Sequence, residues 1–139
     1  MDLQFIDHYT IRVKKSELPA IRKFYISALG LKEGFRPPFD FPGHWLYLGD
    51  RPTVHLMGNA PEKEPKPHAK APTGKFNHVS FRAKNIAATR KRLKKLGMKF
   101  HEQAVPHFPL YQIFLTDPVG VQIELTFKVA NKRNGGSAA

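Results

Sequence analysis

Four residues have the types and the spacing to hold a metal ion together. His8 and His55 lie in the first half of the chain, and nearly the same separation divides His78 from Glu124 in the second half. Taken singly, a strand histidine is more often a hydrogen-bonded or edge residue, and a strand carboxylate is more often solvated. The shared spacing changes this assessment, because imidazole and carboxylate together suit Fe, Mn, Ni, Co or Zn.

The absence of cysteine narrows the chemistry further. The 139 residues include none, which excludes disulfides, thiol nucleophiles and thiolate metal ligands. We therefore expect a divalent metal held by His8, His78 and Glu124, with His55 as a fourth candidate.

The elements that must position these residues are predicted twice, as β-α-β-β-β, a linker, and β-α-β-β-β. Expected strands span residues 5–13, 31–35, 45–48 and 53–57, then 76–83, 98–100, 112–116 and 121–127, with helices at 17–29 and 86–96 and a loop at 101–109. Four pairs of segments match between the halves: Asp7–Arg12 with Asn77–Arg82, Leu29–Leu31 with Leu96–Met98, Leu46–Asp50 with Ile113–Asp117, and His55-Leu56 with Glu124-Leu125.

The last two strands are predicted to form a hairpin that turns at Asp-Pro-Val-Gly. Its second strand alternates Val121, Ile123, Leu125 and Phe127 with polar residues, so Glu124 is expected on the face opposite the apolar set. If the apolar set faces the helices, Glu124 points to an open face where a pocket can form.

Local signals also predict where the helices begin and end. Ser16 and Asn85 are the expected N-caps, Pro19 is tolerated in a first turn, and Gly30 and Gly97 follow the last turns. The residues expected to face inward are Ile21, Phe24, Tyr25, Ala28, Ile86, Leu93 and Leu96.

Composition predicts a first module at residues 1–58, a proline-rich linker at 59–75, a second module at 76–129 and a disordered tail at 130–139. Neither a signal peptide nor a run long enough for a membrane helix is visible, so a cytoplasmic protein with no membrane partner is expected.

The charge is strongly positive, at +12 from 23 Lys and Arg against 11 Asp and Glu. The densest cluster, residues 90–95, falls on the second helix, where a solvated face is the simplest interpretation. No nucleic-acid motif accompanies it, so no nucleic-acid partner is expected, and the charge favours an anionic small substrate instead.

The motifs resemble those of the vicinal-oxygen-chelate superfamily, which includes glyoxalase I, extradiol dioxygenases, fosfomycin-resistance enzymes and bleomycin-binding proteins. The matching segments are Asp7–Thr10, Phe24-Tyr25 with Leu29–Leu31, Asn77–Phe81, and Phe114–Gly120 with Ile123–Leu125. The resemblance implies an α+β fold of two βαβββ modules that form a curved, mostly antiparallel eight-stranded sheet of half-barrels with the helices outside. It implies His8, His78 and Glu124 as metal ligands, and a homodimer. His55 stands where glyoxalase I-like members have glutamate.

Several activities fit this resemblance. The lead interpretation is a glyoxalase-like lyase or isomerase with Glu124 as the base. An extradiol-type Fe(II) dioxygenase is the alternative, with His107 and Tyr111 near its substrate. A non-enzymatic drug-binding protein and a thiol transferase are further alternatives, although bleomycin-binding relatives lack the metal triad. Trp45, Phe39 and Phe108 are expected to contact an aromatic or otherwise apolar substrate.

Overall fold

The computed structural model describes residues 1–2, 4–64 and 76–130 and divides into two compact units, Met1–Lys66 and Pro67–Ala139. Each unit is described by itself. Part of the predicted linker, 65–75, and nearly all of the predicted tail lie outside the described residues, so both remain predictions.

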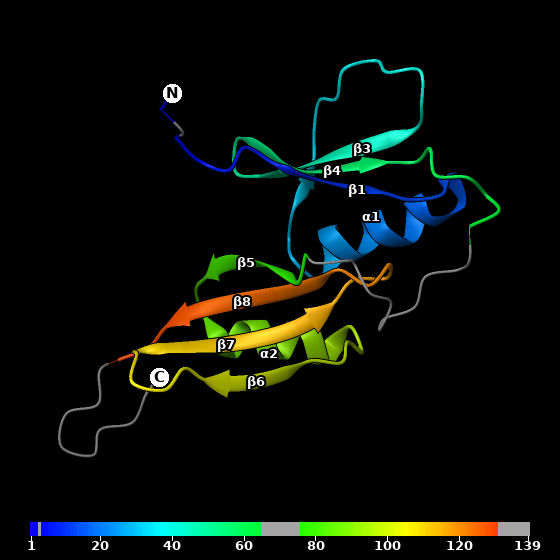
Figure 1. The fold of residues 1–139 in the computed structure, drawn as a ribbon. Helices are drawn as coiled ribbons and strands as arrows, with labels where there is room; N and C mark the ends of the chain where they lie inside the picture. The colour runs from blue at the N-terminus through cyan, green and yellow to red at the C-terminus, as the bar shows by residue number, and fades with distance from the viewer. Residues whose placement is uncertain (3, 65–75, 131–139) are drawn as a thin grey trace. The chain divides into compact units, whose positions relative to one another are not determined.

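The first unit packs one long helix against a four-stranded sheet (Figure 1). The sheet order is β1-β4-β3-β2, with β1 parallel to β4 and the other two pairs antiparallel. In chain order the elements are β1 (Tyr9–Arg12), the 3-10 turn η1 (Lys15–Glu17), α1 (Leu18–Ser27), β2 (Lys32–Glu33), β3 (Gly43–Leu48) and β4 (Arg51–Met57).

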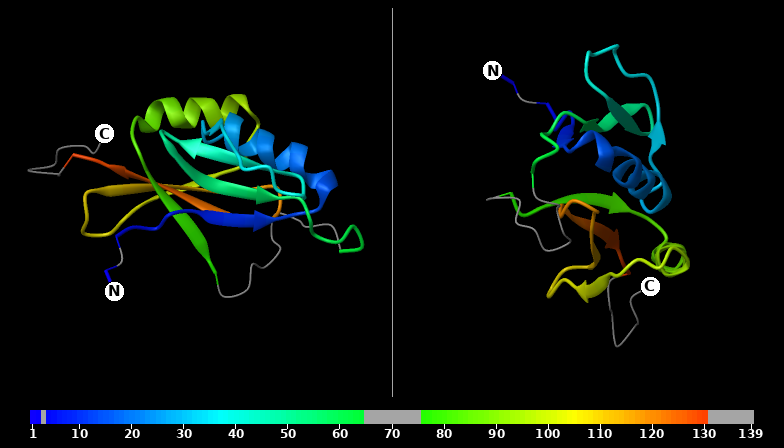
Figure 2. Two further views of the ribbon diagram at one scale, coloured as in Figure 1. Left: turned by 90° about the horizontal axis from the view of Figure 1, so that it is seen from above. Right: turned by 90° about the vertical axis from the view of Figure 1, so that its right-hand side faces the viewer.

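The second unit repeats this topology, with the sheet order β5-β8-β7-β6 and β5 parallel to β8. Its elements are β5 (His78–Ala83), α2 (Ile86–Lys95), β6 (His101–Ala104), β7 (Leu110–Thr116) and β8 (Gln122–Lys128). In each unit the helix lies on one face of its sheet (Figure 2). Thr10 is the strand partner of His55, and Ser80 is the partner of Glu124, so the two halves also agree in register.

The predicted α+β class with two βαβββ modules is confirmed. The eight strands form two open sheets of four, and each sheet has two antiparallel pairs and one parallel pair. The parallel pair arises because the helix carries the chain across the sheet before the remaining strands are added.

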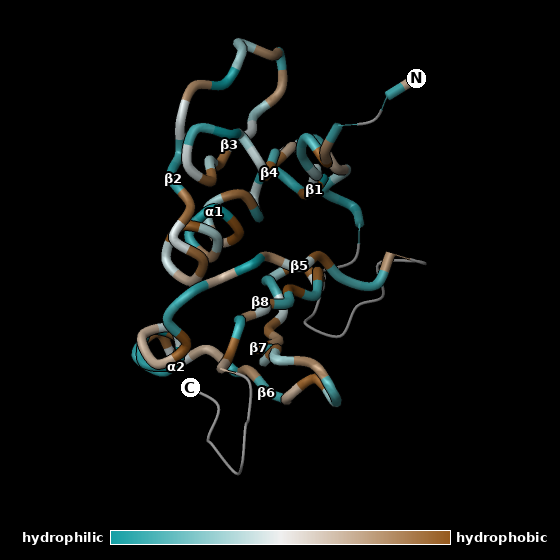
Figure 3. The backbone as a smooth tube through the Cα atoms, turned by 90° about the vertical axis from the view of Figure 1, so that its left-hand side faces the viewer, coloured by the Kyte–Doolittle hydropathy of each residue, from teal (hydrophilic) through white to brown (hydrophobic). Residues whose placement is uncertain are grey.

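Apolar residues facing the helices form the core of each unit. In the first unit Ile21, Tyr25, Leu46, Val54 and Leu56 are at most 1% exposed, and in the second unit Leu93, Ile113, Ile123 and Phe127 are equally buried. Hydrophobic and hydrophilic residues are interspersed along β7 and β8, as expected for strands with one face buried (Figure 3).

Both helices end as predicted, but one predicted core residue is wrong. Gly30 and Gly97 have φ angles of 75° and 68°, the left-handed conformation that glycine adopts most easily after a last turn. Leu96 is 39% exposed, because it is the C-cap residue of α2 and lies beyond the buried stripe that includes Leu93.

Two other local predictions are corrected. Ser16 does not cap α1, because its hydroxyl donates to Glu62 at 3.1 Å and the helix begins after η1 with Glu17 as N-cap. The strand expected at 98–100 instead begins at His101 and extends into the predicted loop, where it pairs with β7. Its polar sequence lacks the apolar alternation of a half-buried strand, and pairing at the sheet edge defines it.

The basic cluster on α2 is a solvent-facing surface, as predicted. Lys91, Arg92, Lys94 and Lys95 are exposed, and Arg90 forms a salt bridge of 2.6 Å with Glu102 on β6. This hydrogen bond raises the pKa of Arg90, in opposition to the smaller effect of burial. Among the described residues, no helix is long and apolar enough to cross a membrane.

Candidate metal centre

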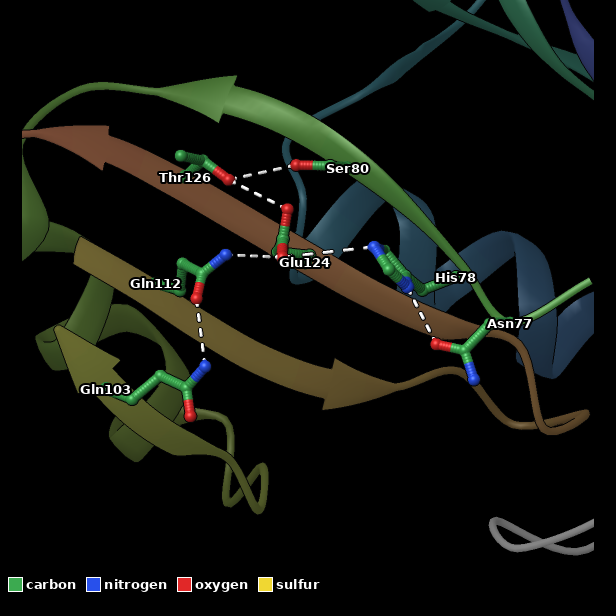
Figure 4. Close-up of polar contacts among 7 residues, drawn as sticks. All are labelled: Asn77, His78, Ser80, Gln103, Gln112, Glu124 and Thr126. Atoms are coloured by element: carbon green, nitrogen blue, oxygen red, sulfur yellow. Dashed lines mark hydrogen bonds and ion pairs between the residues drawn. The ribbon is translucent and has the colours of Figure 1, made fainter. Parts of the chain in front are cut away.

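A line of polar side chains crosses the face of the second sheet that lies opposite α2 (Figure 4). Glu124 stands at its centre on β8, with the apolar side chains of the same strand on the other face, as the hairpin alternation predicts. His78, the first residue of β5, brings Nε2 to 3.9 Å from Glu124 Oε1. An imidazole nitrogen and a carboxylate oxygen therefore meet on this face.

Neutral donors hold both oxygens of the Glu124 carboxylate. Gln112 Nε2 donates to Oε1 at 2.6 Å, and Thr126 Oγ1 donates to Oε2 at 2.9 Å. Gln103 supports Gln112 with a hydrogen bond of 3.0 Å, and Ser80 lies 2.9 Å from the Thr126 hydroxyl. Glu124 is only 9% exposed, so these donors replace the water that an exposed carboxylate would have.

The partner of His78 determines which ring nitrogen can accept a metal. Its Nδ1 lies 2.7 Å from Asn77 Oδ1, which can only accept, so Nδ1 carries the proton. In the neutral ring the lone pair is then on Nε2, the atom that faces Glu124. A metal-ligating histidine typically has its other nitrogen bonded in this way.

The first unit repeats the arrangement around His8. His8 Nδ1 lies 2.7 Å from Asp7 Oδ1, so its Nε2 also carries the lone pair when the ring is neutral. A carboxylate behind a histidine fixes the ring and raises its basicity as a ligand. The Asp7-His8 and Asn77-His78 dipeptides therefore have equivalent geometry.

His55 occupies the strand position equivalent to that of Glu124, but its surroundings differ. Its ring lies between those of His8 and Trp45, with centroid distances of 3.8 Å and 4.0 Å and interplanar angles of 12° and 10°. Its Nε2 donates to the Pro52 carbonyl at 2.9 Å. Burial, and then the charge of His8, lower the pKa of His55, although the Pro52 carbonyl opposes them.

This stacking does not bring His8 and His55 together as ligands of one ion. The lone pair of an imidazole lies in the plane of its ring, and a metal binds about 2 Å from the nitrogen. Two nearly parallel planes 3.8 Å apart do not meet at that distance. In this arrangement His55 supports the His8 ring, and its role as a fourth ligand remains a prediction.

The donor types fit a divalent transition metal, and they occur as pairs within each unit. His78 with Glu124 supplies one nitrogen and one oxygen, and His8 supplies a nitrogen of the same tautomer. These N/O donors suit Fe, Mn, Ni, Co or Zn. Within residues 1–2, 4–64 and 76–130, no group of three or more His, Asp or Glu side chains forms a ready metal cluster.

The predicted substrate-binding residues separate into two groups. Trp45 and Phe39 line a cavity of about 220 Å³ in the first unit, together with His8 and His55. Phe108 is 66% exposed and lies in the loop before β7, and the cavity is not lined by it.

His107 and Tyr111 do not lie beside Glu124. His107 is exposed in the loop before β7 and has a φ angle of 65°. Tyr111 is on β7 next to Gln112, so its side chain lies on the opposite face, where the Arg90 guanidinium is 5.5 Å from its ring centroid. Neither position supplies the acid or base that was expected there.

Sequence reasoning missed the residues that orient the candidate ligands: Asp7, Asn77, Gln112 and Thr126. Asp7 and Asn77 had a visible signal, because each directly precedes a candidate histidine at an equivalent position of the repeat. Gln112 and Thr126 had a weaker signal, as polar residues of the hairpin at the same parity as Glu124. Their direct pairing across β7 and β8 is a matter of register.

Comparison with known proteins is consistent with this duplicated architecture. The family model of the Glyoxalase/Bleomycin resistance protein/Dioxygenase superfamily matches residues 5–125, which is most of the chain. The chain belongs to this superfamily. No curated protein matches it.

Solved structures of this superfamily share the fold. A protein described as a glyoxalase family member from Bacillus anthracis is 23% identical, with a TM-score of 0.71, and the match covers 92% of this chain and 98% of that one. The lactoylglutathione lyase of Agrobacterium tumefaciens is 19% identical, with a TM-score of 0.64 and coverages of 91% and 96%. The fosfomycin resistance protein FosX of Listeria monocytogenes is 16% identical, with a TM-score of 0.66 and coverages of 91% and 94%.

Proposed function

We propose that this superfamily member is a divalent-metal-dependent lyase or isomerase that acts on a small molecule with two neighbouring oxygen atoms. His78 and Glu124 are the proposed metal ligands of the second unit, and His8 is a further ligand. The observation that carries the proposal is the approach of His78 Nε2 to Glu124 Oε1 at 3.9 Å, with Asn77 holding the opposite ring nitrogen. The equivalent Asp7-His8 pair supports it. A FosX mutant in complex with Mn(II) shows that this fold accommodates such a metal.

A bound divalent cation supplies Lewis-acid stabilisation of negative charge on the substrate oxygens. The chain's own residues must then place the substrate and move a proton. Glu124 is the proposed base, because its carboxylate lies on the open face of the sheet and Gln112 and Thr126 fix both of its oxygens. A base held in this way needs little reorganisation when the proton on the substrate carbon is transferred.

Metal retention tests the proposal directly. Protein purified without chelator should hold about one divalent ion per chain, as three N/O ligands are sufficient for such a site. His78→Ala and Glu124→Gln should release the ion. His101→Ala is the matched control, since it removes an exposed imidazole of the same unit whose ring stacks on Phe114 at 4.8 Å. Full retention of metal by His78→Ala would refute the proposal.

Activity assays then separate the reaction classes. Metal-loaded protein should convert a hemithioacetal, and Glu124→Gln should abolish that conversion. Oxygen uptake with catechols and Fe(II) would favour the extradiol-type alternative instead. The displaced positions of His107 and Tyr111 give that alternative no support from geometry.

A further inference from the structure

The cavity of the first unit contains a cationic side chain that neither the fold nor the proposed metal chemistry requires. Arg36 lines it together with Phe39, Phe41 and Trp45, and no Asp or Glu is among the lining residues. At about 220 Å³ the cavity is smaller than the roughly 300 to 1,000 Å³ typical of sites for drug-sized ligands. It therefore suits a small ligand.

Contacts on three sides hold Arg36 in place. Its guanidinium carbon lies 5.0 Å from the ring centroids of both Phe39 and Phe41, and its Nη2 donates to the Phe41 carbonyl at 2.8 Å. Gly43 allows this close packing, since a Cβ at that position would lie 3.0 Å from Arg36 Nη2 and 2.2 Å from the Leu56 carbonyl. The guanidinium is therefore presented in a fixed orientation.

The charge of Arg36 has no carboxylate partner in the described part of the chain. Arg12, Arg22 and Arg90 each lie within 4.0 Å of a glutamate oxygen. Arg36, by contrast, has only the Phe41 carbonyl as a hydrogen-bond partner within residues 1–2, 4–64 and 76–130. Guanidinium has five N–H donors in a planar fork that matches carboxylate and phosphoryl oxygens, so most of its donors remain for a ligand.

We propose that this cavity binds a small ligand with an oxyanion group, either carboxylate or phosphoryl, attached to an aromatic or apolar body. Arg36 binds the oxyanion, and Trp45 and Phe39 contact the body. The identification of this ligand as the substrate rests on the proposed function, because His8 lines the same cavity. Arg36 is then the residue that selects acidic substrates over neutral ones.

Ligand titration monitored by Trp45 tests the inference. Trp45 is the single tryptophan of the chain and lies in the cavity, so its fluorescence reports on binding there. Metal-free full-length protein is titrated with benzoate, phenylphosphonate and the neutral benzyl alcohol. A charge-assisted hydrogen bond predicts about tenfold or tighter binding of an anion relative to the alcohol. The two anions show which oxyanion the cavity prefers.

Variants identify the residue responsible. Arg36→Met should weaken anion binding about tenfold and leave alcohol binding unchanged, and Arg36→Lys should be intermediate because it keeps the charge without the fork. Arg51→Met is the matched control, because Arg51 also covers a phenylalanine ring, that of Phe5 at 4.2 Å, without lining the cavity.

The inference is overturned if anions and the alcohol bind equally, if none of them changes the fluorescence, or if Arg51→Met has the effect of Arg36→Met. These titrations use no metal, so their result is separate from that of metal retention. Loss of metal binding with the anion preference intact would refute the proposed function alone. Metal retention without an anion preference would refute this inference alone.

Discussion

Replacing Gln112 with methionine should weaken both the fold of the second unit and its metal affinity. Methionine has a similar length and volume but donates no hydrogen bond, so the change removes the 2.6 Å bond to Glu124 Oε1. It also leaves Gln103 without the acceptor that it has at 3.0 Å. Thr126 still holds the other carboxylate oxygen.

The size of the effect follows from the burial and charge of Glu124. A hydrogen bond to a charged group contributes about 1.5 to 3 kcal/mol, and Glu124, at 9% exposure, has little access to replacement water. We therefore expect Gln112→Met to lower the free energy of unfolding by about 2 kcal/mol at neutral pH. Loss of a residue that orients a ligand typically weakens metal binding by about 10- to 100-fold.

Two measurements check this prediction. Urea unfolding followed by far-ultraviolet circular dichroism gives the stability, and equilibrium dialysis against a divalent metal gives the affinity. Gln103→Met is the matched control, since it changes the same residue type on the same sheet but removes only an exposed bond between neutral groups. Its expected effect on stability is about 1 kcal/mol or less.

Equal effects of the two substitutions would refute the reasoning, because only Gln112 contacts the carboxylate. So would a Gln112→Met protein with the stability and metal affinity of the unchanged chain. A loss of stability without a loss of affinity would show that Gln112 supports the fold but does not position a ligand.

Three further predictions follow from buried groups. Asp117→Ala removes a carboxylate, 1% exposed, that accepts the Val119 and Val121 backbone N–H groups at 2.9 and 2.8 Å, and should destabilise the chain by about 3 kcal/mol in urea unfolding. Leu93→Ala should cost about 2 to 5 kcal/mol in the same assay, because Leu93 is fully buried, whereas Leu96→Ala should have little effect. The lowered pKa of His55 means that the unfolded chain binds its proton more readily, so stability should fall as pH drops below about 6.5, and His55→Gln should flatten that part of the pH profile; an unchanged profile would contradict this.

The duplicated architecture was predictable because its signals are local. Alternating apolar residues define strands, glycine after an apolar helical stripe marks a helix end, and both patterns occur twice along the chain. The placement of Glu124 on the face opposite the Val121 to Phe127 set followed from alternation alone. The same rule could have separated Tyr111 from Glu124, once the register of the two strands was known.

Other features depend on pairing between distant segments, which a single sequence does not encode locally. The sequence by itself determined the repeat, the βαβββ order, and the equivalence of His8 with His78 and of His55 with Glu124. Only the tertiary structure decided that His55 stacks between two rings, that Gln112 and Thr126 hold Glu124, and that Arg36 lies between two phenylalanine rings. The physical reason is that side-chain periodicity fixes the face on which a residue lies, whereas register and loop conformation determine which side chains it contacts.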